Sequence, residues 1–210
     1  MRLFGCQILR RGDTKTPKIA LTFDDGPHPV FTPMLLDILE RIEGKGTFFT
    51  TGRNILDNLS LSEDMVRRGH MIGNHTFDHP HALWSGRGKL HDEIKKTKEL
   101  IEELSEKPNK IFRPPYGFIT PSMLSICRQL ELSIVLWNSN SKDYKRDVPE
   151  IMVNRVRDKI TSGSILLFHE CHFNKPSLDY SGTLKALKSV VDIVKLRGLH
   201  PVTIGEMFTL

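Results

Sequence analysis

Two adjacent aspartates and a pair of histidines four residues apart are the residues of this chain best suited to chemistry. Asp24 and Asp25 directly follow an apolar run, and His75 and His79 bracket the tripeptide Thr-Phe-Asp. Two imidazoles and one carboxylate form a common ligand set for a divalent catalytic metal that keeps a position open for water. Neighbouring carboxylates resist ionising together unless a cation is near, so one aspartate can bind the metal while the other acts as a base. The pattern predicts metal-dependent hydrolysis.

The histidine spacing suggests how the metal ligands are arranged. Four residues is about one helical turn, so we expect His75 and His79 to lie on one side of a helical turn, within reach of a single ion. A bound zinc ion lowers the pKa of its water toward about 7, and a base must then take a proton during attack. His169 follows another apolar run. Because imidazole titrates near neutral pH, His169 is the candidate acid for the leaving group.

The elements that must position these residues alternate between short apolar runs and amphipathic stretches. We expect strands at 18–23, 46–50, 70–74, 110–113, 132–137, 164–168 and 200–203, with an eighth candidate at 3–9. We expect helices at 33–42, 87–104, 121–130, 149–160 and 183–196. Alternating strands and helices predict a mainly parallel sheet in one α/β domain.

The fold class that this alternation favours is an irregular (β/α) barrel of seven or eight units. The usual eightfold barrel takes about 250 residues, and this chain has 210, so we expect an irregular or incomplete one. The alternative is an open doubly wound sheet, but no GxGxxG or GxxxxGK loop is present. Polar residues follow five of the expected strands, so they should converge at the carboxyl ends of a barrel, where active sites form.

Composition excludes several other classes of protein. The net charge is +5, but the basic residues are dispersed and no nucleic-acid footprint of clustered Lys and Arg is present. Three cysteines without CxxC spacing argue against a disulfide framework. No apolar run approaches the roughly 20 residues of a membrane span. No signal peptide is recognisable, so we expect an extracellular or cell-surface location if such a segment was trimmed, and a cytoplasmic one otherwise.

Several segments, in order along the chain, resemble the motifs of the polysaccharide deacetylases, carbohydrate esterase family 4. These segments are Ile-Ala-Leu-Thr-Phe-Asp-Asp-Gly-Pro at 19–27, His-Thr-Phe-Asp-His at 75–79, Arg-Pro-Pro-Tyr-Gly at 113–117 and Leu-Phe-His at 167–169. The resemblance runs from about residue 18 to residue 207. It implies a catalytic domain at 18–210 that follows an N-terminal segment at 1–17, and a fold that is an irregular (β/α) barrel.

The resemblance also implies a role for each matching metal and acid–base residue. Asp25, His75 and His79 would bind the metal, usually Zn²⁺, with other divalent ions such as Co²⁺ possible. Asp24 would be the general base, and His169 the general acid.

The resemblance further implies supporting residues around this centre. Arg113 would pair with Asp24, and Asp143 would hydrogen-bond His169. The backbone N–H of Tyr116 would stabilise the oxyanion. Leu167 and Trp137 would line the pocket for the acetyl methyl group.

The chain departs from the family pattern near the fourth and fifth motifs. Tyr144 stands where tryptophan is common, Asn138 and Asn140 stand where aspartate is common, and Glu170-Cys171-His172 follows the acid where a single Asp is common. We interpret His172 as a loop residue. Trp84 follows the metal motif, and we expect it either to stack on a sugar ring or to pack in the core.

The predicted function is removal of acetyl groups from a carbohydrate polymer by a monomeric enzyme. N-deacetylation of GlcNAc units in peptidoglycan or chitin oligomers is the first hypothesis. The alternatives are O-deacetylation of acetylxylan, a catalytically silent carbohydrate-binding homologue, and hydrolysis of small cyclic amides. An acetylated glycan is the expected partner, with no nucleic acid and no membrane insertion.

Overall fold

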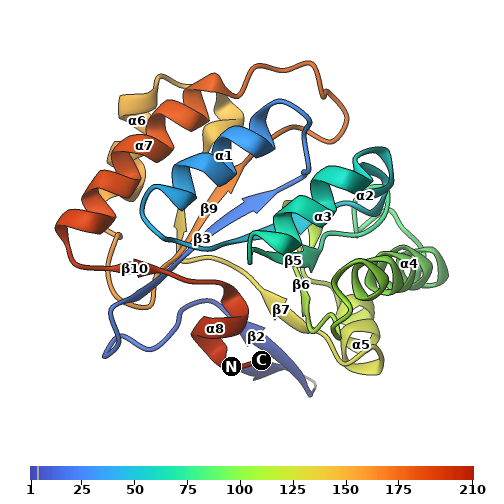
Figure 1. Cartoon of the computed structure of the whole chain (residues 1–210). Helices are drawn as coiled ribbons and strands as arrows, with labels where there is room; N and C mark the ends of the chain where they lie inside the picture. The colour runs from blue at the N-terminus through green and yellow to red at the C-terminus, as the bar shows by residue number, and fades with distance from the viewer. Residues whose placement is uncertain (4) are drawn as a thin grey trace.

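A curled sheet wrapped by helices forms the body of the protein (Figure 1). The structure is a computed structural model that describes residues 1–3 and 5–210. Its strands are β1 (Arg2–Leu3), β2 (Cys6–Leu9), β3 (Lys18–Asp24), β4 (Gly46–Thr50), β5 (Met71–Asn74), β6 (Ile111–Phe112), β7 (Ser133–Val135), β8 (Ser139–Asn140), β9 (Ile165–His169) and β10 (His200–Pro201). Its helices are α1 (Phe31–Glu40), α2 (Gly52–Asp57), α3 (Leu59–Arg67), α4 (Arg87–Ser105), α5 (Pro121–Gln129), α6 (Pro149–Arg157), α7 (Ser181–Leu196) and α8 (Ile204–Phe208), with 3-10 turns at Pro115–Gly117 and Asp143–Lys145.

The strand order makes this sheet an incomplete barrel. Neighbouring strands run β1-β2-β7-β6-β5-β4-β3-β9-β8, and β10 pairs with the start of β3. Every pairing is parallel except the β1–β2 hairpin. Within the described part of the chain no pairing joins β8 back to β2, so the barrel stays open there. The prediction of an irregular, incomplete (β/α) barrel is confirmed.

The central strand β3 shows how the sequence divides its side chains between two cores. Ile19, Leu21 and Phe23 pack with the outer helices, and the Phe23 ring stacks on Phe48 with centroids 4.9 Å apart. Ala20, on the opposite face, lies in the barrel interior with residues of α8, which covers one end. A strand buried on both faces is apolar nearly throughout, as expected for a parallel sheet. The alternation therefore turns Asp24, two positions after Thr22, toward the barrel interior at the carboxyl end of β3.

Some elements differ from those expected from the sequence. The helices α2, α3 and α8 and the short strands β1 and β8 were not predicted. The expected strand at 200–203 ends at Pro201 because Thr203 caps α8, accepting a hydrogen bond from Glu206 N at 3.1 Å while the Glu206 side chain accepts one from Thr203 N. Residues within the expected N-terminal segment form β2, which pairs with β7. None of the described helices is both long enough and apolar enough to cross a bilayer.

Candidate active site

The carboxyl ends of neighbouring strands deliver the predicted ionisable residues to one end of the barrel. Asp24 ends β3, where it pairs in register with His169 at the end of β9. His75 directly follows β5, and its N–H donates to Thr50 O at the end of β4. Arg113 directly follows β6, and its N–H donates to Asn74 O. Parallel register therefore gathers residues from distant parts of the chain at a single mouth.

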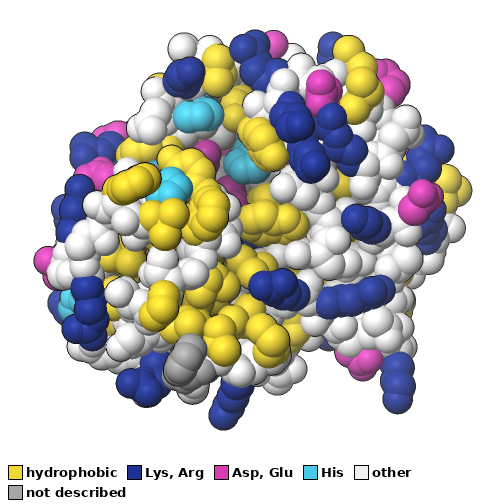
Figure 2. Space-filling model, turned by 180° about the vertical axis from the view of Figure 1, so that it is seen from behind, with side chains coloured by type: hydrophobic (Ala, Val, Ile, Leu, Met, Phe, Trp, Pro, Cys, Tyr) yellow, Lys and Arg dark blue, Asp and Glu magenta, His cyan; other side chains and the backbone are white. Residues whose placement is uncertain are grey.

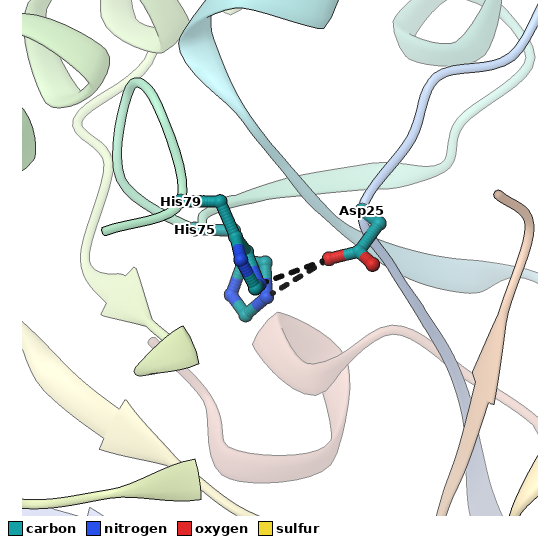
Figure 3. A group of neighbouring side chains, drawn as sticks. All are labelled: Asp25, His75 and His79. Carbon is teal, nitrogen blue, oxygen red and sulfur yellow. Dashed lines mark ion pairs between the residues drawn. The ribbon is translucent and has the colours of Figure 1, made fainter. Parts of the chain in front are cut away.

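Asp25, His75 and His79 form a compact cluster of metal-binding groups (Figure 3). Asp25 Oδ1 lies 3.4 Å from His75 Nε2 and 3.2 Å from His79 Nε2, and one ligand atom from each residue falls within 4.8 Å of the others. The predicted ligand set is thus brought together. The expected helical turn is wrong, however, because residues 75–79 form a loop in which Thr76 and His79 have positive φ angles of 68° and 52°.

The donor atoms of this cluster fit a divalent cation. Among the described residues, no correctly oriented hydrogen-bond donor reaches Asp25 Oδ1, although this atom is buried. His75 Nδ1 lies 2.7 Å from the carbonyl oxygen of Arg113. Since a carbonyl can only accept, Nδ1 carries the proton and Nε2 presents a lone pair toward Asp25. Burial alone would raise the pKa of Asp25, but the other histidines around it, including His79 and His169, outweigh burial and hold this pKa well below its ordinary value. An ionised carboxylate and two imidazoles are a ligand set suited to zinc.

Asp24 is held by a fully buried arginine. Arg113 Nη1 donates to Asp24 Oδ1 at 2.7 Å and to Thr22 Oγ1 at 2.8 Å. The guanidinium also lies 4.0 Å from the centroid of the Phe49 ring. Burial lowers the pKa of Arg113 and Asp24 opposes this, and arginine remains charged in proteins. The pair therefore fixes one oxygen of Asp24, while Oδ2 lies 3.9 Å from His75 Nε2, beside the metal cluster.

His169 and Asp143 form the second buried pair. His169 Nδ1 donates to Asp143 Oδ1 at 2.8 Å, and His169 N donates to Asp143 Oδ2 at 2.7 Å. Thr183 Oγ1 donates to the same Oδ2 at 3.2 Å. Burial alone would lower the pKa of His169, but the charge and hydrogen bond of Asp143 raise it to about 9. The imidazole is therefore protonated at neutral pH, with Nε2 as the nitrogen free to donate to a ligand.

A pocket of about 350 Å³ is lined by both the metal cluster and His169. Its lining contains the predicted Asp24, Asp25, His75, His79, Tyr116, Trp137, Leu167 and His169, together with Gly117, Asn140, Tyr144, His172 and Tyr180. Tyr116 adopts a left-handed conformation with φ of 59°, and Gly117 follows with φ of 73°. A Cβ on Gly117 would lie 2.8 Å from the Trp137 ring, so only glycine allows this ring to pack directly against the turn.

Three aromatic or histidine side chains in the lining had been given no pocket role in the sequence analysis. Tyr144, which stands where tryptophan is common in the family, packs edge-on against His169 with ring centroids 5.7 Å apart. His172 lies in a loop, as interpreted, but also reaches the pocket. Tyr180 immediately precedes α7, and no local sequence signal marks it. These residues reach the site through the loops that follow β8 and β9.

The comparisons with known proteins match this geometry. A family model described as polysaccharide deacetylase matches residues 11–135. The chain belongs to the polysaccharide deacetylase family. A peptidoglycan-N-acetylglucosamine deacetylase of Bacillus cereus is 34% identical over 90% of this chain and 87% of its own length. A chitooligosaccharide deacetylase of Azorhizobium caulinodans is 33% identical over 86% of this chain and 89% of its own length. The crystal structure of the peptidoglycan N-acetylglucosamine deacetylase Bc1960 superposes with a TM-score of 0.88 at 31% identity, covering 97% of this chain and 94% of that one.

Membership in the family makes this polysaccharide deacetylase a metal-dependent hydrolase that acts on carbon–nitrogen bonds. The matched range includes Asp24, the metal cluster and Arg113, whereas His169 and Asp143 lie beyond it. Another pocket, of about 450 Å³, includes His70 and Asn109 near the amino ends of β5 and β6. It contains none of the predicted site residues, so the carboxyl-end pocket is the one that fits the family's chemistry.

Proposed function

We propose that this polysaccharide deacetylase removes the N-acetyl group from GlcNAc units of a glycan, in peptidoglycan or in chitin oligomers. The observation that carries the proposal is the buried His169–Asp143 pair, which keeps a protonated imidazole in the same pocket as the metal cluster. An amine leaving group needs a proton far more than an alkoxide does, so a dedicated acid favours amide over ester hydrolysis. The two relatives described above are both named for deacetylating GlcNAc-containing glycans.

The roles of the residues follow from their contacts. Asp25, His75 and His79 would hold the metal, for which we propose Zn²⁺ with Co²⁺ as an alternative. Such an ion would supply Lewis-acid polarisation of the acetyl carbonyl and would lower the pKa of water. Asp24 accepts the proton of the attacking water through Oδ2, since its Oδ1 is held by Arg113.

The remaining pocket residues act on the substrate. His169 Nε2 donates the proton to the leaving nitrogen. The backbone N–H of Tyr116 donates to the tetrahedral oxyanion. Leu167 and Trp137 contact the acetyl methyl group. We further infer that the protein acts as a monomer, because a single chain supplies all of these residues.

The substrate proposal is tested by comparing acetate release from GlcNAc oligomers, peptidoglycan and acetylxylan under the same conditions. We expect release from at least one GlcNAc polymer at a rate well above that from acetylxylan. His75→Ala should abolish release, and His91→Ala, which alters a half-buried histidine beside Asp92 on α4 and outside the pocket, should not. Faster release from acetylxylan would replace the proposal by O-deacetylation. Full activity in His75→Ala protein would refute the site itself.

A further inference from the structure

The active-site pocket is small compared with a polymeric substrate. At about 350 Å³ it lies near the lower end of the range for small-ligand pockets, which is about 300–1,000 Å³. Such a volume holds only a short part of a glycan, so the remaining units of a long glycan must lie on the protein surface. The surface that adjoins the pocket therefore decides whether a long glycan binds better than a short one.

An aromatic surface lies beside the pocket, and we call it the aromatic rim: the half-buried His81 and the exposed Trp84, Tyr116 and Phe118. Trp84 is 85% exposed, Tyr116 54% and Phe118 49%. The alternative that Trp84 packs in the core is therefore wrong. Figure 2 shows hydrophobic side chains gathered around a histidine, next to a hollow in which histidine and acidic side chains lie. Contiguous exposed aromatic groups beside a functional pocket mark a binding surface.

Ring-to-ring contacts connect the rim to the metal cluster. The Tyr116 ring lies edge-on to His79 with centroids 4.8 Å apart, and its centroid also lies 4.9 Å from that of the His81 ring. His81 in turn lies 5.4 Å from Phe118 and 6.3 Å from Trp84. The rim is thus one continuous series of rings, in which Tyr116 contacts the proposed metal ligand His79 and Trp84 is the most exposed member. A glycan that occupies the pocket and runs in this direction crosses the rim.

Local hydrogen bonds of the backbone and of two side chains stabilise the turn that carries Trp84. Trp84 N donates to His81 O at 3.0 Å, and Ser85 Oγ donates to the same oxygen at 3.1 Å. Leu83 N donates to His81 Nδ1 at 3.3 Å. Because these bonds fix the turn before any ligand arrives, a sugar that stacks on Trp84 need not order the loop, and little binding energy is lost to entropy.

We propose that the aromatic rim is a second sugar-binding subsite, at which Trp84 stacks against a GlcNAc unit next to or near the one being deacetylated. The apolar C–H face of a pyranose ring matches an exposed indole, as amphipathic aromatic residues commonly do at wet interfaces. The occupant is the substrate glycan itself, because the rim is continuous with the pocket that holds the reacting unit. This inference rests on the proposed GlcNAc substrate and adds that affinity rises with glycan length.

The kinetic test uses Trp84→Ala with GlcNAc oligomers of two lengths. Loss of one aromatic stacking contact should raise KM for a pentamer about three- to tenfold and leave kcat unchanged. The increase in KM should be smaller for a dimer. Trp84→Phe, which keeps an aromatic ring, should have a KM for the pentamer close to that of the wild type. Leu196→Ala removes a comparably exposed apolar side chain, 86% exposed at the end of α7, and should change neither KM nor kcat. Equal KM for wild type and Trp84→Ala on the pentamer would overturn the subsite, as would a fall in kcat that is the same for both lengths.

A binding test separates failure of the subsite from failure of the proposed function. The chain has two tryptophans, so Trp137→Phe protein contains Trp84 as its sole indole. Adding the GlcNAc pentamer should shift or quench its fluorescence saturably. A saturable change without acetate release by the wild type would retain the subsite and refute the deacetylase activity on this glycan. If the wild type releases acetate, the fluorescence of Trp84 does not respond to the pentamer, and Trp84→Ala leaves KM unchanged, the subsite alone is refuted.

Discussion

Replacing Asp143 by asparagine should move the alkaline limit of activity down by about two and a half pH units. Asp143 is 1% exposed and contacts both the ring and the backbone of His169. It is the largest of the causes that raise the pKa of His169 from 6.5 to about 9. A cation bound at Asp25 offsets the smaller contribution of that carboxylate, which leaves Asp143 as the residue that keeps the imidazole protonated.

The size of the effect follows from the two pKa values. A shift from 6.5 to about 9 corresponds to a preference for imidazolium on the order of 3 kcal/mol. At pH 8 an imidazole with a pKa of about 9 is about 90% protonated, whereas one with a pKa of 6.5 is about 3% protonated. At pH 5.5 both are more than about 90% protonated. Protonation alone therefore costs the Asp143→Asn variant about 30-fold in kcat/KM at pH 8 and almost nothing at pH 5.5.

The assay is kcat/KM for acetate release between pH 5.5 and 9.5 with the metal held saturating. The variant should lose activity as pH rises through a lower midpoint than the wild type, because the raised pKa keeps the acid protonated until pH passes about 9. Asp147→Asn removes a carboxylate from the same loop, but its partner is Arg155, and it should leave the profile unchanged. A variant-to-wild-type ratio that is constant across the pH range would refute a protonation role for Asp143 and leave only an orienting one.

Two further predictions concern the stability of the buried machinery. Arg113→Met leaves Asp24 as an uncompensated buried charge and should lower the free energy of unfolding by about 3–5 kcal/mol, measured by denaturant titration. The control Arg53→Met breaks an exposed pair and should lower it by less than about 1 kcal/mol. Equal losses in the two variants would contradict the burial argument. Gly26→Ala should lower the free energy of unfolding by about 1–3 kcal/mol, because its Cβ would overlap the Glu170 carboxyl group. The double variant Gly26→Ala with Glu170→Ala should regain part of this stability, measured by thermal unfolding. No recovery would show that the strain lies elsewhere.

The positions of Asp24 and His169 were predictable because each follows a short run of mainly apolar residues. Such runs become strands buried on both faces of a parallel sheet, and the polar residues that end them meet at one edge. The local pattern and the direction of the chain are therefore enough to predict the barrel class and the gathering of the predicted site residues around one pocket.

The conformation of the metal loop was not predictable, because distant residues fix it. Glu93 on α4 accepts hydrogen bonds through Oε2 from Phe77 N at 3.0 Å and Asp78 N at 2.7 Å. Thr76 N donates to Asn74 Oδ1 at 2.9 Å. These contacts hold a loop with positive φ angles where the spacing alone suggested a helical turn. A glutamate 15 residues further along the chain gives no local sign of this role.

The site of Glu170 shows another limit of sequence reasoning. The residue was noted as a departure from the family pattern, but its surroundings become clear only in three dimensions. Its carboxyl group is buried against Gly26, and Thr32 Oγ1 hydrogen-bonds it. Burial raises its pKa to about 8, so the group is largely neutral at pH 7. Tyr180 was missed for a similar reason, since only the folding of α7 against the barrel brings it to the pocket.

The most direct test of the account is a metal titration of the chelated protein, followed by acetate release from GlcNAc oligomers. The central claim is that Asp25, His75 and His79 hold one divalent cation on which hydrolysis depends. Metal-free protein should be inactive, and acetate release should rise in proportion to bound Zn²⁺ up to one equivalent per chain. His79→Ala protein should bind no stoichiometric metal and stay inactive. Undiminished acetate release from protein shown by elemental analysis to be free of metal would contradict the claim.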